Sequence, residues 1–323
     1  MGEHADDAGD ADDKALALFE EHRSTLFAVA YRMLGRVTDA EDTVQEAWLR
    51  WSAGDRSDVQ EPRAYLVRIV SRLAIDRLRQ LTARKETYVG PWLPEPLPTD
   101  RAVLGPEAAP DGADRAVLAD TVSYAVLLVM ESLSPLERAV FVLREAFGLP
   151  YAEIATALGR GQDAVRQLAG RARRHMEERR PRFTVDADQQ RHLTERFLAA
   201  ALEGDLDGLL TILAPDVTFV GDSGGKTKGP LRPIRGAGDV SRFTAGIARR
   251  ALVVPEFHLV DLNGGPALLV SEEGRLPYAV ILLEVADGLV RRVLMVGNPD
   301  KIAHLPVPDH RIRLDDAEDR PRA

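Results

Sequence analysis

The sequence predicts a multidomain protein: two all-α domains, the second a helix-turn-helix, joined by a proline-rich linker and followed by an α+β domain. Three observations support this fold class. Apolar residues recur at helical spacing up to about residue 86 and again up to about residue 180. Between these stretches, the segment PWLPEPLPTD (91–100) has four prolines in ten residues, which excludes a regular helix or strand. Beyond about residue 188, helices are followed by short β-rich runs, as in a separate α+β unit.

Length and composition limit the function classes. The chain has 323 residues, enough for two or three domains, and 45% of them are hydrophobic. It has no cysteine, which excludes disulfides, thiol catalysis and thiolate metal sites, and we expect no cofactor and no metal. No apolar run is long enough to span a membrane, and the acidic N-terminus MGEHADDAGDADDK is unlike a signal peptide. A cytoplasmic protein with no membrane association is therefore expected.

Charge is distributed unevenly along the chain. The net charge of −9 by itself argues against nucleic-acid binding. However, residues 61–86 and residues 162–182 each contain seven basic and three acidic residues. Local basic patches, rather than the total charge, determine phosphate binding. Each stretch is therefore a candidate nucleic-acid surface, although a solvated helix face would have the same composition.

The first domain is predicted over residues 15–86 from three helical stretches. Its first helix ends at Gly35, and the second begins with a predicted capping box, Thr38 with Glu41 three residues later. Acidic side chains of the second helix lie opposite its apolar face and form an acidic stripe of Asp39, Asp42 and Glu46. In the third helix, arginines align on one flank: Arg68, Arg72 and Arg79.

The second domain is predicted over residues 114–181, after a linker at 87–113, and Ser134-Pro135 marks a helix start within it. YAEIATALG, a tight turn and QDAVRQLAGRARRHM have the pattern of a helix-turn-helix. Apolar residues occupy one face of the second of these helices: Val165, Leu168, Ala169, Ala172 and Met176. Polar residues and a glycine occupy the opposite face and its margins: Asp163, Arg166, Gln167, Gly170, Arg171, Arg173 and Arg174. Arginine and glutamine can bind base edges and phosphates, but a plain helical hairpin with a solvated arginine-rich face has the same pattern.

The third domain is predicted over residues 188–310. A helix, QQRHLTERFLAAALEGD, and a shorter one precede five strand-like runs: VTFV, EFHLVDL, ALLVS, YAVILLEV and LVRRVLMV. Asp287-Gly288 between the last two is a two-residue hairpin signal. A curled antiparallel sheet is expected, with flexible tails at residues 1–14 and 311–323.

Three segments resemble the DNA-binding domains of extracytoplasmic-function sigma factors over roughly residues 15–180: LFAVAYRMLGRVTDAEDTVQEAWLRW, EPRAYLVRIVSRLAIDRLR and LSPLERAVFVLREAFGLPYAEIATALGRGQDAVRQLAGRARR. The resemblance implies a subunit that binds core RNA polymerase and promoter DNA. It implies core binding by Asp39, Asp42, Gln45 and Glu46. It implies −10 element binding by Arg68, Arg72, Asp76, Arg77 and Arg79. It implies −35 element binding by Gln162, Asp163, Arg166, Gln167, Gly170, Arg171, Arg173 and Arg174. Gly161 stands where relatives usually have a capping Ser or Thr, at a cost of a few tenths of a kcal/mol.

The rest of the chain resembles a SnoaL-like (NTF2-like) domain, and WLPEP, DSGGK and NPDK resemble motifs of the SigJ-like group of sigma factors, which carry such a domain at the C-terminus. Ser223 stands where those relatives mostly have glycine. The resemblance implies a regulatory contact between domains, made by Trp92, Leu93, Pro94, Glu95, Pro96, Asp222, Ser223, Gly224, Gly225, Lys226, Asn298, Pro299, Asp300 and Lys301.

The segment 91–100, here called the docking strip, is therefore expected to bind DSGGK, NPDK or their neighbours. Proline fixes φ and favours extended backbone, so the strip presents Trp92 and Leu93 at low entropic cost. A structure with Trp92 bare in solvent would contradict this expectation. Either loop motif could instead be a plain turn.

Two other functions remain open from the sequence. One is a SnoaL-like cyclase or isomerase fused to a DNA-binding module, with Asp222, His258 and Asp261 as candidate acid–base residues. The other is a stand-alone helix-turn-helix repressor. A small-molecule ligand in the pocket of the SnoaL-like domain is also conceivable. Since the acidic stripe and the −10-type helix have no role in either alternative, we expect a sigma factor and not an enzyme.

Overall fold

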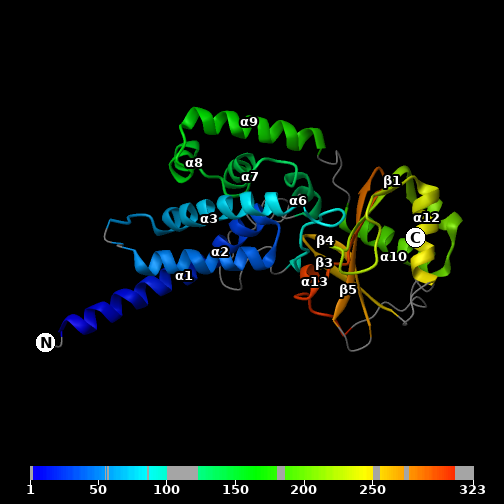
Figure 1. Cartoon of the computed structure of the whole chain (residues 1–323), viewed down its shortest axis with the longest axis horizontal. Helices are drawn as coiled ribbons and strands as arrows, with labels where there is room; N and C mark the ends of the chain where they lie inside the picture. The colour runs from blue at the N-terminus through cyan, green and yellow to red at the C-terminus, as the bar shows by residue number, and fades with distance from the viewer. Residues whose placement is uncertain are drawn as a thin grey trace. The chain divides into compact units, whose positions relative to one another are not determined.

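A computed structural model of the chain is shown in Figure 1. It describes residues 3–54, 56, 58–85, 87–99, 123–179, 186–249, 255–272 and 276–309. The chain forms two compact units, Met1–Glu86 with Asp100–Arg180 and Thr87–Thr99 with Pro181–Ala323. Residues 91–99 of the docking strip therefore belong to the second unit. The remainder of the expected linker (100–113) and the expected C-terminal tail (311–323) lie outside the described residues.

Three helices form the first part of unit 1: α1 (Glu3–Leu34), α2 (Val37–Ala53) and α3 (Pro62–Lys85). Because α1 begins at Glu3, most of the segment expected as an N-terminal tail is helical. The predicted capping box of Thr38 and Glu41 is wrong, since α2 starts at Val37 after Arg36 and has no side-chain cap. Thr38 already lies inside the first turn of α2. The three helices pack on one another through buried apolar residues that include Leu26, Val29, Val44, Leu66 and Val70.

The second part of unit 1 contains the predicted helix-turn-helix. Its elements are α6 (Tyr124–Met130), α7 (Pro135–Phe141), a π-helical turn η1 (Val142–Ala146), α8 (Tyr151–Leu158) and α9 (Gln162–Arg179). The helix start at Ser134 is confirmed, because Ser134 and Glu137 form a reciprocal capping box. Gly159 ends α8 in the left-handed region with φ 61°. All five residues predicted for the apolar face of α9 are buried.

The two parts of unit 1 pack against each other, with α3 against α7 and α8 (Figure 1). Arg138 on α7 is 1% exposed, and its Nε donates to the carbonyl of Arg32 on α1 at 3.1 Å. Its Nη1 lies 2.8 Å from Oε1 of Glu131. Burial lowers the pKa of Arg32 to about 10, although Tyr31 acts in the opposite direction. Buried arginines thus join the two helical parts.

Unit 2 is the expected helix-and-sheet unit. Its helices are α10 (Ala187–Glu203), α11 (Leu206–Ile212), α12 (Ala237–Arg249) and α13 (Pro299–Ile302). Its strands are β1 (Leu213–Asp222), β2 (Ile234–Arg235), β3 (Glu256–Leu262), β4 (Gly265–Ser271), β5 (Pro277–Ala286) and β6 (Leu289–Val296). The sheet order is β2-β1-β6-β5-β4-β3. The Asp287-Gly288 hairpin between β5 and β6 is confirmed, with positive φ at both residues.

The sheet is mixed, so the expectation of a purely antiparallel sheet is wrong for one pair of strands. β1 runs parallel to β6, with Gly221 opposite Met295, whereas the other pairs are antiparallel. Most of the domain separates these two strands in sequence, so no hairpin forces them to be antiparallel. One face of the sheet forms the core of the unit with α10, α11 and α12, through residues that include Phe197, Leu209, Phe219, Val240, Leu283 and Val293.

Among the described residues, no helix has both the length and the apolar character needed to cross a membrane.

Candidate functional site

A buried ion pair in unit 2 binds the docking strip. Asp222, the last residue of β1, is 0% exposed, and its Oδ2 lies 2.7 Å from Nζ of Lys301 on α13, which is 1% exposed. The same Oδ2 accepts a hydrogen bond from the backbone N–H of Leu93 at 2.8 Å. Lys301 Nζ donates to the backbone carbonyl of Leu93 at 2.6 Å. The pair thus satisfies both backbone groups of one strip residue and takes them out of water.

Two aromatic rings complete the surroundings of Lys301. Its Nζ lies 3.3 Å from the ring centroid of Trp92 and 5.1 Å from that of Tyr88. The two rings meet edge to face with centroids 4.7 Å apart. The Tyr88 hydroxyl donates to Oδ1 of Asp222. A cation between aromatic faces is stabilised by their quadrupoles, so the ring of Trp92 is packed on the ammonium. The predicted contact of the strip with DSGGK and NPDK is confirmed.

The other end of the strip pairs with the turn between β3 and β4. The Leu97 N–H donates to Oδ1 of Asn263 at 2.9 Å, and the Asn263 N–H donates to the Leu97 carbonyl at 2.8 Å. The Pro96 carbonyl accepts a hydrogen bond from Nε2 of His304 at 3.0 Å. Pro98 forms an antiparallel bridge with Leu262 in β3, an edge strand of the sheet. The strip therefore adds extended backbone to a sheet edge, a common mode of peptide recognition.

The middle of the strip is fully enclosed. Leu93 and Leu97 are each 1% exposed, Glu95 is 0% exposed, and Pro94 and Pro96 are buried. Sequence reasoning identified the motif residues but missed Tyr88, Asn263 and His304. The available signals were the position of Tyr88 next to the strip and the Asn263-Gly264 turn pair. His304 had no sequence signal that we can identify.

The two loop motifs fit closely at the point where they meet. Gly224 has φ 57°, and a Cβ there would lie 2.4 Å from Nδ2 of Asn298. That Nδ2 donates to the Tyr88 hydroxyl oxygen at 2.8 Å, and Oδ1 of Asn298 accepts from the N–H of Asp300 at the start of α13. Ser223 does not have a positive φ, so the departure from glycine at this position causes no backbone strain. Lys226 and Asp300 form a second ion pair between the motifs, with both side chains about half exposed.

The acidic stripe of α2 is only partly on the surface. Asp42, Gln45 and Glu46 are exposed, as expected. The expected surface position of Asp39 is wrong, because this residue is only 2% exposed. Asp39 is ion-paired with Arg36 at 3.1 Å and with Arg77, whose Nε donates to it at 2.7 Å. The residue pattern of one helix could not predict this burial, because Arg77 lies on another helix.

In this part of unit 1, Arg77 differs from its expected role, and Leu49 had no expected role. Arg77, expected at DNA, is engaged inside the helical unit by Asp39. Leu49, which sequence reasoning missed, is 55% exposed three residues after Glu46 and shares its helix face. The exposed face of α2 therefore combines acidic side chains with an apolar one.

The arginine flank of α3 lies against the helix-turn-helix. Arg72 Nε donates to the carbonyl of Ala157 at 2.7 Å, and Nη2 donates to that of Thr156 at 3.3 Å. These carbonyls belong to the last turn of α8, where the helix dipole is negative, so a guanidinium is favourable there. Arg68 stacks over the Tyr65 ring at 4.6 Å. Asp76 and Arg79 form an exposed pair at 2.9 Å.

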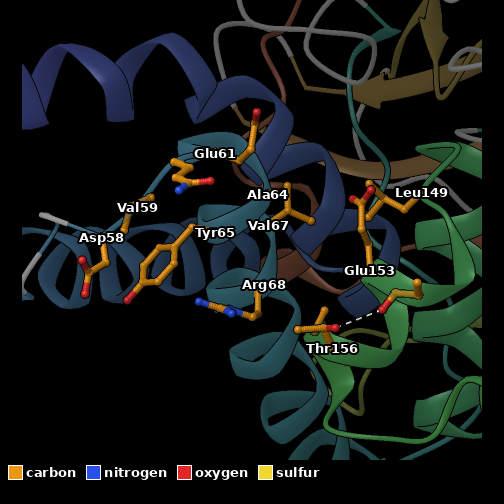
Figure 2. Close-up of a pocket in the computed structure, with 13 residues that line it drawn as sticks. Asp58, Val59, Glu61, Ala64, Tyr65, Val67, Arg68, Leu149, Glu153 and Thr156 are labelled. Carbon is orange, nitrogen blue, oxygen red and sulfur yellow. Dashed lines mark hydrogen bonds between the residues drawn. The ribbon is translucent and has the colours of Figure 1, made fainter.

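A cavity of about 570 Å³ lies next to this contact. One side is formed by the segment before α3 and by the first turns of α3, and the other by α8 (Figure 2). Its lining residues include Val59, Tyr65, Arg68, Leu149, Glu153 and Thr156. In the described arrangement of unit 1, α8 therefore covers part of the arginine flank for which the family resemblance implies −10 element binding.

The polar face of α9 is on the surface. Gln162, Asp163, Arg166, Gln167, Arg171, Arg173 and Arg174 are exposed, and Gly170 is partly exposed. A Cβ added at Gly170 would meet nothing within 4 Å, so packing within the chain does not require glycine there. Three arginines are held by carboxylates: Arg166 by Asp163, Arg171 by Glu137 and Arg173 by Glu145.

These ion pairs affect the titration of their partners. The hydrogen bond to Glu145 raises the pKa of Arg173. Burial raises the pKa of Glu137, but hydrogen bonds from Ser134 and the charge of Arg171 outweigh it, so the pKa of Glu137 is lowered overall.

The candidate acid–base residues do not form a common site. Asp222 is engaged by the docking strip. His258 is 1% exposed with Nε2 3.0 Å from the hydroxyl of Ser271, and Asp261 pairs with Arg191 at 2.7 Å. Each candidate thus has a structural role of its own.

Comparisons with known proteins define the class. Residues 18–84 match the family model of sigma-70 region 2, and residues 123–176 match that of sigma-70 region 4. The chain is also 39% identical over 302 residues to the ECF RNA polymerase sigma factor SigJ of Mycobacterium tuberculosis, an alignment that covers 91% of this chain and 95% of the relative. The chain belongs to the family of ECF RNA polymerase sigma factors.

Within that family, the similarity to SigJ extends to the C-terminal domain. The crystal structure of Mycobacterium tuberculosis SigJ superposes with a TM-score of 0.67 at 38% identity and covers 88% of this chain and 97% of that one. The probable ECF sigma factor SigI of the same species is 39% identical over 205 residues, which are 64% of this chain and 69% of the relative. These relatives are named as sigma factors, a class of transcription initiation factors and not of enzymes, so the comparisons support the sigma-factor expectation and give no support to the cyclase alternative.

Proposed function

We propose that the chain works in the cytoplasm as a promoter-recognition subunit of RNA polymerase whose output is set by its own C-terminal domain. The observation that supports this is the buried Asp222–Lys301 pair, which binds both backbone groups of Leu93. Leu93 lies in the sequence between the two promoter-binding domains, whose separation must match the promoter. A domain that binds this connection can therefore influence whether both domains reach DNA together.

The proposed partners follow from the exposed faces. Core polymerase is bound by the face of α2 with Asp42, Gln45 and Glu46, because acidic side chains suit a basic protein groove and are repelled by DNA. Duplex DNA of the −35 element is bound by α9 through Gln162, Asp163, Arg166, Gln167, Gly170, Arg171, Arg173 and Arg174.

The −10 element is bound by the flank of α3 through Arg68, Arg72, Asp76 and Arg79, with Arg77 contributing only after it leaves Asp39. On this proposal, Arg72 must also release the carbonyls of α8 before it can bind DNA. A small-molecule ligand of the C-terminal domain stays a prediction.

The regulatory part is tested by in vitro transcription with core polymerase on a promoter selected by this holoenzyme from a random library. Asp222→Asn weakens the grip on Leu93, and Asp261→Asn, an exposed residue of the same domain, is the matched control. We expect transcript yield to change several-fold with Asp222→Asn only, while core binding stays unchanged. Unchanged yield and promoter choice for Asp222→Asn and for a chain lacking residues 188–323 would contradict the regulatory proposal.

The polymerase-binding part is tested separately by pull-down of core enzyme. Reversal of Asp42 and Glu46 to lysine should abolish capture, because two acidic contacts become repulsive. Reversal of Asp76, an exposed acid on α3, is the control and should leave capture intact. Tight binding to duplex operator DNA without polymerase, together with no effect of the α2 reversals, would favour the repressor alternative.

A further inference from the structure

Most basic side chains described in unit 2 are neutralised by acidic neighbours. The ion pairs are Arg191 with Asp261, Lys226 with Asp300, Arg242 with Asp239, Arg291 with Asp216 and Asp287, Arg292 with Glu284, and Lys301 with Asp222. Arg196 hydrogen-bonds to Thr211 instead. Most of the described Lys and Arg side chains of this unit thus have an acidic partner.

One loop departs from this pattern. Between β1 and α12, Lys228, Arg232 and Arg235 are all exposed, and none of them forms an ion pair with a described residue. The segment 223–238 contains no acidic residue. Leu231, in the middle of the loop, is 59% exposed. The three residues therefore form a basic segment of the chain, here called the basic loop (228–235), on a domain whose other described residues include many more Asp and Glu than Lys and Arg.

The basic loop is held in place by side-chain packing and by one strand pairing. Pro230 packs on β1 so closely that a Cβ at Gly221 would lie 3.0 Å from its Cδ. A Cβ at Gly90 would lie 3.6 Å from Cδ2 of Leu231. At its end, Ile234 pairs with Phe219 of β1. A loop fixed in this way loses little conformational freedom on binding, which favours affinity.

We propose that the basic loop binds the phosphate backbone of duplex DNA and adds sequence-independent affinity to promoter binding. Phosphate is the anion that Lys and Arg bind without further specificity elements, and the loop contains no Asn or Gln that could read adenine edges. The chain also limits where the loop can go. Gly90, beside the loop, is eleven residues beyond Arg79, and because α3 continues to Lys85 the chain between them spans less than about 40 Å.

This proposal requires only that the chain binds DNA, as its family does, and it is independent of regulation by the docking strip. It predicts a salt effect of defined size. Each phosphate contact contributes about 0.9 to the slope of log Kobs against log salt concentration. Loss of three contacts therefore lowers the slope by about 2.7. The fold-loss of affinity on going from 50 to 200 mM salt then becomes roughly 40 times smaller than for the parent chain.

The experiment measures binding of the full chain to a fluorescein-labelled DNA duplex of scrambled sequence by fluorescence anisotropy. The duplex has about 40 base pairs, and binding is measured across that salt range. The loop variant is Lys228→Ala with Arg232→Ala and Arg235→Ala. We expect its slope to fall by about 2 to 3. The control variant is Arg191→Ala with Arg196→Ala and Arg291→Ala. It has the same net charge as the loop variant and should keep the slope of the parent chain.

A charge-conserving variant separates charge from folding. Lys228→Arg with Arg232→Lys and Arg235→Lys should retain the parental slope. Equal losses in the loop and control variants would indicate an effect of net charge and overturn the proposal. Loss of core-polymerase capture with unchanged DNA binding would also overturn it, because the loop would then bind an acidic protein surface.

Discussion

Two lysine–carboxylate ion pairs join DSGGK to NPDK, one buried and one exposed. The side chains of Asp222 and Lys301 are 0% and 2% exposed, whereas those of Lys226 and Asp300 are 51% and 54% exposed. The buried pair is bound on all sides by the Leu93 backbone, the Tyr88 hydroxyl and the Trp92 ring. The exposed pair has water as its alternative partner. The same chemistry therefore fixes a third segment in one case and only links two loops in the other.

The largest expected effect is that of Asp222→Ala. It leaves the Lys301 ammonium buried without its counter-charge, and breaking a buried pair in this way typically costs about 3–5 kcal/mol. The free energy of opening of β5 and β6, measured by native-state hydrogen exchange, should fall by that amount. Asp300→Ala is the control for the exposed pair. Equal losses from the two variants would mean that burial is not what distinguishes the pairs.

A double-mutant cycle sharpens the comparison. For Asp222→Ala and Lys301→Met, we expect a coupling free energy of about 1–3 kcal/mol, since removal of both charges avoids an uncompensated one. The corresponding cycle for Lys226→Ala and Asp300→Ala should give a coupling near zero. Both are measured by urea unfolding of the full chain with the same hydrogen-exchange probes. A coupling of the same size in both cycles would contradict the proposed difference.

Trp92→Leu tests the aromatic part of the buried site. Loss of a desolvated cation–π contact should cost about 2 kcal/mol, while Trp92→Phe, which keeps a weaker aromatic face, should cost less. The readout is the protection of amide hydrogens at Leu93 and Leu97. If leucine and phenylalanine behave alike, the indole serves only as apolar surface.

The smallest effect is expected for Lys226→Ala. An exposed pair is worth about 0–1 kcal/mol and is screened by salt. Unfolding at low and high salt concentration should therefore show a small loss that disappears at high salt. A loss of several kcal/mol, insensitive to salt, would place this pair in the same class as the buried one.

Local patterns were sufficient to predict the helices and the helix-turn-helix. The spacing of Val165, Leu168 and Ala172 fixed the buried face of α9, because that face depends only on helix periodicity. The resemblance of three short motifs was sufficient to predict that the docking strip contacts DSGGK, NPDK or their neighbours, but not which residues make the contact. The first prediction needed only neighbouring residues, whereas the second depended on the family resemblance, because the strip and its partners are far apart in sequence.

Contacts between distant segments were not predictable in the same way. The burial of Asp39 depends on Arg77, which lies on another helix, and the charge pattern of α2 alone indicated a surface position. The parallel pairing of β1 with β6 has no hairpin signal. Asn263, bound to Leu97, was unrecognised because its role arises only when the strip reaches the sheet edge.

The docking strip and its binding site are far apart in sequence, and this has a consequence for biosynthesis. Leu93 is 129 residues before Asp222 and 208 residues before Lys301. At a translation rate of about 5–20 residues per second, Leu93 is made roughly 10–40 s before Lys301. Once residue 180 has been made, both promoter-binding domains are complete while the segment between them has no site to occupy. Each new molecule therefore exists first as a two-domain nascent chain, and the third domain can bind the strip only after Lys301 has been made.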